Sequence, residues 1–377
     1  MENLIELLSK AKTNEEAKKL FFANINSISS PDKFLDQVNP ELNPEINDET
    51  FNIIYQMTSL FKQLDANKNE YQRYIEKGKL QKAKIFILRN MDLLKQYEFE
   101  SEDFFQWTIR EQNNLAILYR KNGKIEEAKK LFLDILDQHA KGDSKYEKYS
   151  KMAAYAELGN ICALERSFEE AINYTEKAAM IIKDLNLIQE SGQIHEQLGY
   201  FYFKINDAIN AIKCFKISIN YFNKLKTQFS KNAIGKINYQ IGEVMVAQKN
   251  FNEAIEFYNK SIDILLDDET ENIQILCEVF GQMGNAYLDY GSSISPIEFL
   301  ESVAKQKSNC IEKSPHELQK QGIKAFCSAL FFSIKCGNEE MSTQLIDLLS
   351  KFDNIDQIAE EHYKDLKIKN IWKMINE

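Results

Sequence analysis

A pair made of a large apolar residue and a small residue recurs along the chain at a nearly constant interval. Successive copies are separated by 43, 40, 43 and 42 residues, and in the first four copies an alanine follows the small residue at a distance of twelve. A fixed interval of this length is typical of helical repeats, in which each unit of two helices packs against its neighbours. The pairs are Leu115-Ala116, Leu158-Gly159, Leu198-Gly199, Ile241-Gly242 and Met283-Gly284, and the alanines are Ala128, Ala171, Ala211 and Ala254.

The spacing inside each copy predicts two helices that cross closely. A glycine or alanine at the crossing lets two helices approach, so we expect small residues to pack against small residues there, with aromatic side chains filling the space beside them. The first helix is predicted to end seven residues after the crossing, because glycine and asparagine accept the left-handed backbone of such a stop. These end positions are Gly123, Arg166, Asn206, Lys249 and Gly291.

Proline is absent from the part of the chain that carries the repeats. The chain has five prolines in 377 residues, and none lies between Glu45 and Ser295. Because a proline inside a helix removes a hydrogen bond and clashes with the preceding turn, its absence allows helices throughout this stretch. Leu, Ile, Ala, Lys and Glu dominate it, and most of these favour helix. We therefore predict an all-α fold, a right-handed α-solenoid of helix pairs with a short helical N-terminal segment and a C-terminal capping helix.

Four segments carry a large, small and aromatic order on the first helix and an alanine and aromatic order on the second. They read "NNLAILYRKNGKIEEAKKLF", "AELGNICALERSFEEAINYTEKA", "EQLGYFYFKINDAINAIKCF" and "YQIGEVMVAQKNFNEAIEFY". On these segments the chain resembles the tetratricopeptide repeat family over about residues 108–266, which implies helix pairs that bind peptides or proteins. That family repeats every ~34 residues. The longer interval here predicts a longer second helix and loop, and it is similar to the repeats of kinesin light chains and bacterial peptide-pheromone receptors.

The pattern weakens toward both ends of the array, where terminal repeats have to present a polar outer face. Gly78 and Gly337 mark the turns of weaker copies. We predict N-terminal helices and a proline-containing loop over residues 1–59, a repeat array over 60–350 with its strongest repeats at 108–266, and a capping helix over 351–377.

The charge and the apolar pattern limit the partners and the compartment. The formal net charge is −10, which disfavours nucleic acid and anionic membranes as partners, because both require a cationic surface. The opening "MENLIELLSK" lacks the apolar core of a secretory signal, and eighteen apolar residues never run together. We therefore expect a cytoplasmic protein with no nucleic-acid or membrane partner.

The residues that could support catalysis or metal binding do not form a motif. The segments "HEQLG" at His195 and "HELQK" at His316 begin like the zinc-protease helix, but the second histidine is missing from both. The six cysteines are spread singly, which favours buried thiols over a disulfide framework or a zinc site. We predict no metal, no cofactor, no catalytic residue and no enzymatic activity.

The first helix of each pair lines the concave side of such an array, so its inward positions are candidate binding residues. We count six and three residues before the crossing residue and one and four residues after it. These positions carry amide, aromatic and charged side chains that suit an extended peptide. The same count also selects Glu278 and Gly281. We call all these positions the first-helix stripe, and its predicted binding residues are Arg110, Asn113, Arg120, Asn160, Glu196, Tyr200, Phe203, Lys236, Tyr239, Glu243 and Asn285.

The sequence favours a non-catalytic adaptor or sensor that holds a peptide or protein segment in its concave groove. One alternative is an intracellular receptor for a short signalling peptide, and a second is a hydrolase with a composite site. A segment of the chain itself or a second subunit filling the groove is also open, as is a homo-oligomer.

Overall fold

The described part of the chain is built from helices, and it contains no β-strand. In the computed structural model the described residues are 2–11, 48–96, 102–139, 142–293 and 314–352, with single positions at 13, 16, 17, 20, 21, 34, 35, 38, 41, 46, 355, 358, 359, 361 and 362. The chain divides into two compact units, Met1–Leu185 and Asn186–Glu377. Each unit is described by itself below.

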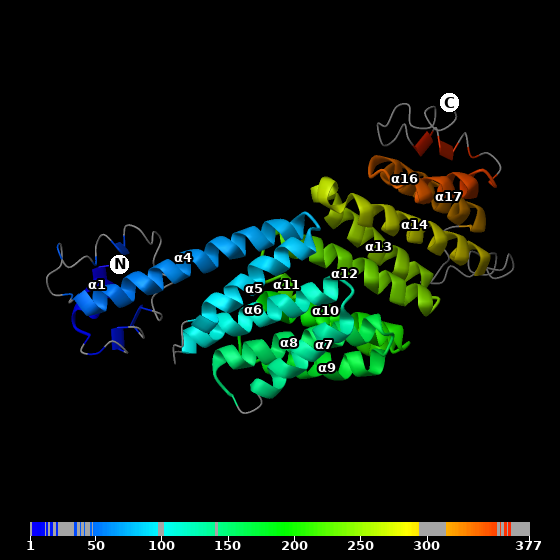
Figure 1. Ribbon diagram of the computed structural model, residues 1–377. Coiled ribbons are helices and arrows are strands. Elements are labelled where there is room, and N and C mark those ends of the chain that lie inside the picture. Colours follow the sequence, from blue (N-terminus) through cyan, green and yellow to red (C-terminus); the bar gives the residue numbers. More distant parts are fainter. Residues whose placement is uncertain are drawn as a thin grey trace. The chain divides into compact units, whose positions relative to one another are not determined.

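Unit 1 is a series of antiparallel helix pairs (Figure 1). Helix α4 pairs with α5, α6 with α7, and α8 with α9, and each pair packs on the next along the chain. The bounds are α1 (Glu2–Ser9), α4 (Asp48–Glu76), α5 (Leu80–Gln96), α6 (Glu102–Lys121), α7 (Ile125–Gln138), α8 (Lys145–Leu164) and α9 (Phe168–Ile182).

Unit 2 is also built from paired helices, of which α14 and α16 are the longest. Helix α10 pairs with α11, α12 with α13, and α14 with α16, while α17 packs on α16. The bounds are α10 (Ile188–Lys204), α11 (Ala208–Phe222), α12 (Gln228–Ala247), α13 (Phe251–Leu265), the short 3-10 helix η2 (Leu266–Asp268), α14 (Glu269–Ser293), α16 (Pro315–Lys335) and α17 (Glu339–Leu349). The predicted all-α fold of paired helices is confirmed.

An aromatic ring covers the crossing glycine in several pairs. A Cβ atom built at Gly199 would lie 2.6 Å from ring atoms of Phe215, and one at Gly242 would lie 2.4 Å from the ring of Tyr258. Both rings are fully buried. The ring four residues after the repeated alanine therefore lies directly on the glycine at these two crossings, whereas the sequence analysis placed the aromatic side chains beside the crossing.

The turn after the first helix follows the predicted spacing in the first four copies of the repeat. Gly123, Arg166, Asn206 and Lys249 have positive φ angles of 75°, 61°, 61° and 61°. Gly291 is different, because α14 continues through it to Ser293. The prediction of a helix end there was wrong. Gly291 instead allows α16 to approach closely, since a Cβ at this position would lie 3.3 Å from the carbonyl oxygen of Pro315.

The helices differ in length within the repeated pairs. The second helices α7, α9, α11 and α13 have 14 or 15 residues, whereas the first helices α6, α8, α10 and α12 have 17 to 20. The first helix is thus the longer member of each of these four pairs, and the expected lengthening of the second helix and its loop relative to the family interval of ~34 residues stays a prediction. The division into residues 1–59, 60–350 and 351–377 stays a prediction, and α4 crosses its first boundary.

The C-terminal segment is described only in part. Ile355, Ile358 and Ala359 pack on the apolar cluster formed by α16 and α17, and Ala359 is fully buried. The remainder of the predicted capping helix, including Trp372, lies outside the described residues. Among the described helices, none has the length and apolar character needed to cross a membrane.

Candidate functional site

Two of the four predicted binding residues in unit 1 hold helices together. Asn113 is only 8% exposed, and its side-chain amide donates to the carbonyl oxygen of Ile109 and to Ser150 Oγ. The Nε atom of Arg120 lies 2.8 Å from Glu157 Oε2. Both side chains therefore join α6 to α8. These contacts engage the amide of Asn113 and the guanidinium of Arg120, which were predicted to bind a peptide.

The other two predicted residues of unit 1 lie closer to solvent. Arg110 is exposed, with its guanidinium 3.6 Å from the buried carboxylate of Glu111 and 6.0 Å from the ring centroid of Trp107. Asn160 on α8 is half-buried. Unit 1 thus presents one cation and one amide on its part of the first-helix stripe.

The stripe of unit 2 presents more side chains to solvent than that of unit 1. Tyr200, Lys236 and Asn285 are exposed, and the remaining predicted members on α10 and α12 are half-buried. These half-buried members are Glu196, Phe203, Tyr239 and Glu243. Such residues combine apolar area with polar groups on one surface.

Three carboxylates on successive first helices of unit 2 have raised pKa values. Burial is the largest cause in each case, because it disfavours the charged form. It raises the pKa of Glu196 to about 7, with Lys236 opposing the shift. The pKa of Glu243 is also raised, although a hydrogen bond from Tyr258 and the charge of Lys204 oppose this. For Glu278, burial and the negative charge of Glu243 both raise the pKa.

Aromatic residues accompany these carboxylates. Tyr258 Oη donates a hydrogen bond of 2.7 Å to Glu243 Oε1, and the ring of Tyr239 lies 6.0 Å from that of Tyr258. The pKa of Tyr239 is raised by burial and then by the charges of Glu243 and Glu278. On α10, Lys204 Nζ lies 5.0 Å from the ring centroid of Tyr200. The surface therefore combines carboxylates, phenols and a cation packed over an aromatic face.

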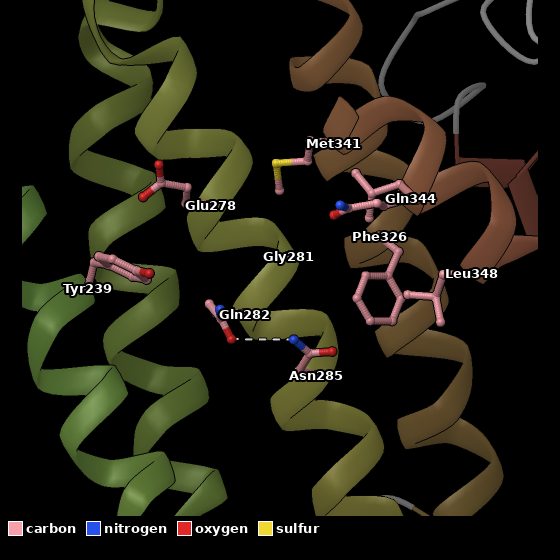
Figure 2. Close-up of a pocket in the computed structure, with 10 residues that line it drawn as sticks. Tyr239, Glu278, Gly281, Gln282, Asn285, Phe326, Met341, Gln344 and Leu348 are labelled. Carbon is pink, nitrogen blue, oxygen red and sulfur yellow. Dashed lines mark hydrogen bonds between the residues drawn. The ribbon is translucent and has the colours of Figure 1, made fainter. Parts of the chain in front are cut away.

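A cleft of about 360 Å3 opens at the end of this stripe, between α14 and α17. Figure 2 shows Glu278 and Gln282 on the side of α14 that faces Tyr239, and Met341 extending toward α14. The predicted binding residues Tyr239 and Asn285 contribute to its wall. The full lining is Tyr239, Glu278, Gly281, Gln282, Asn285, Phe326, Met341, Gln344, Leu345 and Leu348.

Six of the ten residues that line the cleft were not selected by the sequence analysis. Met341, Leu345 and Leu348 lie on one face of α17 at helical spacing, and Phe326 comes from α16. The spacing of 341, 345 and 348 was a usable signal, but an apolar face of this kind is more often part of a core. Sequence reasoning does not distinguish a covered face from one that lines a cleft.

The cysteines and histidines considered above form no metal-holding cluster in the described part of the chain. Cys162, Cys214, Cys277 and Cys327 are buried free thiols, and Cys336 is partly buried. Cys310 lies outside the described residues. Within those residues, no group of three or more His, Cys, Asp and Glu side chains is placed to hold a metal ion.

The raised pKa of Glu196 makes stability depend on pH. The unfolded chain has the ordinary value of 4.5 and the folded chain a value of about 7, so the free energy of unfolding falls as pH rises through this interval. We expect Glu196→Gln to stabilise the chain by about 1–2 kcal/mol at pH 8. This is less than the ~3 kcal/mol that corresponds to the whole pKa shift, because the side chain keeps some solvent contact.

Urea unfolding followed by circular dichroism at pH 4.5 and pH 8 measures this effect. At pH 4.5 the native glutamate is protonated in the folded state, so the variant and the parent should differ by less than about 0.5 kcal/mol. An equal gain at both pH values would show that the glutamine acts through packing and not through the charge.

A comparison of the sequence with protein families identifies one that covers most of the repeat array. Residues 112–359 match the family described as "Soluble NSF attachment protein, SNAP". A curated relative, the uncharacterized protein ycf37 of Cyanophora paradoxa, is 35% identical over 80 residues, which are 21% of this chain and 44% of that protein. The chain thus spans less than half the length of that relative.

Solved structures with the same fold are tetratricopeptide-type proteins of low sequence identity. A signal transduction ATPase with a tetratricopeptide repeat sensor from Pyrococcus horikoshii has a TM-score of 0.53 and 14% identity, covering 99% of this chain and 53% of that one. The apo form of RapI has a TM-score of 0.51 and 13% identity, covering 81% and 98%. These likenesses confirm the predicted tetratricopeptide-type fold. With the family match spanning residues 112–359 of 377, the chain belongs to the soluble NSF attachment protein (SNAP) family.

Proposed function

We propose that this chain is a non-catalytic adaptor or sensor that holds a peptide or protein segment on its first-helix stripe. Its tetratricopeptide-type fold is consistent with protein interaction, and the family description names an attachment role, which supports a macromolecular partner. The proposal assigns binding to the stripe and assigns no chemical step to any residue.

The observation that carries the proposal is the composition of the unit 2 stripe. Tyr200 is 38% exposed on α10, although aromatic side chains of this size stabilise a fold mainly when buried. On α14 the exposed side-chain amide of Asn285 offers a donor and an acceptor. On α12 the carboxylate of Glu243, which accepts from Tyr258 of the paired helix, has further acceptor capacity. Exposed aromatic anchors beside polar groups are the usual content of an interaction surface.

A double substitution tests the stripe in both units. Changing Tyr200→Ala and Asn160→Ala is expected to weaken partner binding at least tenfold, because tyrosine is enriched among the anchor residues whose loss costs about 2 kcal/mol or more, and tenfold corresponds to about 1.4 kcal/mol. Affinity purification from the native cell identifies the partner, and titration of the purified pair measures the dissociation constant. Circular dichroism should show an unchanged helical fold.

Ile209→Ala provides the matched control on a second helix. Ile209 lies on α11, outside the first-helix stripe, and is 79% exposed, compared with 38% for Tyr200. Its substitution therefore tests whether the loss of any exposed apolar side chain weakens binding. The control should leave partner affinity within twofold. If the double variant also kept its affinity, binding on the stripe would be refuted. Recovery of short peptides alone would favour a signalling-peptide receptor over an adaptor.

A further inference from the structure

We propose that the cleft between α14 and α17 receives a partner segment in which an apolar side chain is flanked by lysine or arginine. This inference rests on the proposed function and names the chemistry of the partner. It concerns the end of the unit 2 stripe, where the apolar part of the cleft meets the carboxylate of Glu278.

The apolar part of the cleft has room for a side chain because α14 has a glycine there. Among the described residues, leaving aside its chain neighbours and its own helix backbone, the one atom within 4 Å of a Cβ built at Gly281 is Met341 Cε at 3.6 Å. Phe326 and Leu345 form a buried floor, while Met341 and Leu348 are half-buried at the walls. The volume of about 360 Å3 lies in the range of ligand sites, and a methionine wall adapts to different apolar shapes.

The polar part of the cleft has a negative charge that a partner can neutralise. Glu278 lies at its edge, and its pKa is raised by burial and by the charge of Glu243. Placing a lysine or arginine beside such a carboxylate favours its ionised form and offsets the repulsion between the two glutamates. The exposed Glu339 and Glu340 in the first turn of α17 add to the negative potential at this end of unit 2.

The amides around the cleft suit the backbone of a bound segment. Gln344 and Gln282 are exposed on α17 and α14, and the side-chain amide of Asn285 donates to Gln282 Oε1 at 3.3 Å. Amide side chains can both donate to and accept from a peptide backbone. An apolar anchor, flanking cations and a hydrogen-bonded backbone together fit a basic peptide segment, whereas an acidic one would be repelled by Glu278.

An array of twelve-residue synthetic peptides tests this chemistry with the purified full-length chain. Each peptide carries a central leucine or phenylalanine flanked by lysine and arginine, by glutamate, or by serine. A further set replaces the central apolar residue with serine. We expect the basic peptides with an apolar centre to bind at least tenfold tighter than the glutamate-flanked, serine-flanked and serine-centred peptides, and their affinity should fall as salt rises.

Two substitutions locate the binding. Glu278→Gln should weaken the basic peptides about fivefold and should not affect the serine-flanked ones, because it removes charge and keeps shape. Gly281→Leu should weaken every apolar-centred peptide at least tenfold by filling the cleft. The control Glu256→Gln on α13 removes an equal charge from an exposed site and should leave affinity unchanged. Circular dichroism verifies that each variant folds.

The outcomes separate this inference from the proposed function. A preference for acidic peptides, or basic binding that Glu278→Gln and Gly281→Leu leave intact, would overturn the cleft assignment. If binding of the native partner still depended on Tyr200 and Asn160, the proposed function would stand although the cleft assignment had failed. Self-association that Gly281→Leu abolishes, measured by sedimentation velocity, would identify a second copy as the occupant and also overturn the inference.

Discussion

Replacing Gly199 with leucine is expected to lower the free energy of unfolding by about 3 kcal/mol. The new Cβ would lie 2.6 Å from two ring atoms of Phe215, and that ring is fully buried in the core of unit 2. Neither the ring nor the helix backbone can move without disturbing the pair formed by α10 and α11. The clash also has to exceed the gain of up to ~1 kcal/mol from replacing a glycine inside a helix.

Gly281→Leu is the matched control for this prediction. It makes the same change on another first helix, where the new Cβ meets a single flexible methyl group at 3.6 Å. We expect this variant to remain within about 1 kcal/mol of the parent, with the sign set by helix propensity. Urea unfolding followed by circular dichroism measures both variants. Similar losses in the two proteins would contradict the close crossing at Gly199.

Tyr258→Ala should be at least as damaging, with an expected loss of about 3–5 kcal/mol. The ring is fully buried, covers Gly242 and lies 6.0 Å from the ring of Tyr239. Its removal leaves a cavity between α12 and α13 and also removes the hydroxyl that donates to Glu243. Urea denaturation at pH 7 measures the total loss.

Two further variants separate the ring from the hydroxyl. Tyr258→Phe keeps the ring, so it should cost only about 1–2 kcal/mol, since the half-buried carboxylate of Glu243 regains part of its hydration. Gly242→Leu should destabilise the parent, but it should restore part of the stability of Tyr258→Ala by filling the vacated space. Additive losses in the double variant would mean that the ring does not lie on Gly242.

The sequence specified the repeat because its spacing reflects a contact that recurs in every pair. The positions of Gly199, Gly242 and the turns at Arg166 and Lys249 all follow from one interval. The interval did not reveal what covers each glycine, because that depends on the angle at which the helices cross. The interval also predicted a helix end at Gly291, where the glycine instead lets α16 approach α14 closely.

The candidate site was predictable in part for a similar reason. Glu196 and Tyr239 occupy the same position in successive repeats, and Glu243 lies four residues after Tyr239 on the same helix, so their shared surface follows from the repeat. Their raised pKa values depend on burial among several helices, and the spacing carries no measure of burial. The α17 wall of the cleft was not predictable, because the last pair has lost the alanine that marks the pattern and only its turn at Gly337 remains.

Polar contacts between helices that are near one another in the chain have a consequence for how this protein is made. Lys129 pairs with Glu165 and Lys148 with Asp184 at a separation of 36 residues, and Asn272 donates to Asn232 at a separation of 40. A short separation means that a helix finds its neighbour soon after both have been synthesised. We therefore expect the nascent polypeptide to assemble progressively while still attached to the ribosome, with little apolar surface left for chaperones to shield.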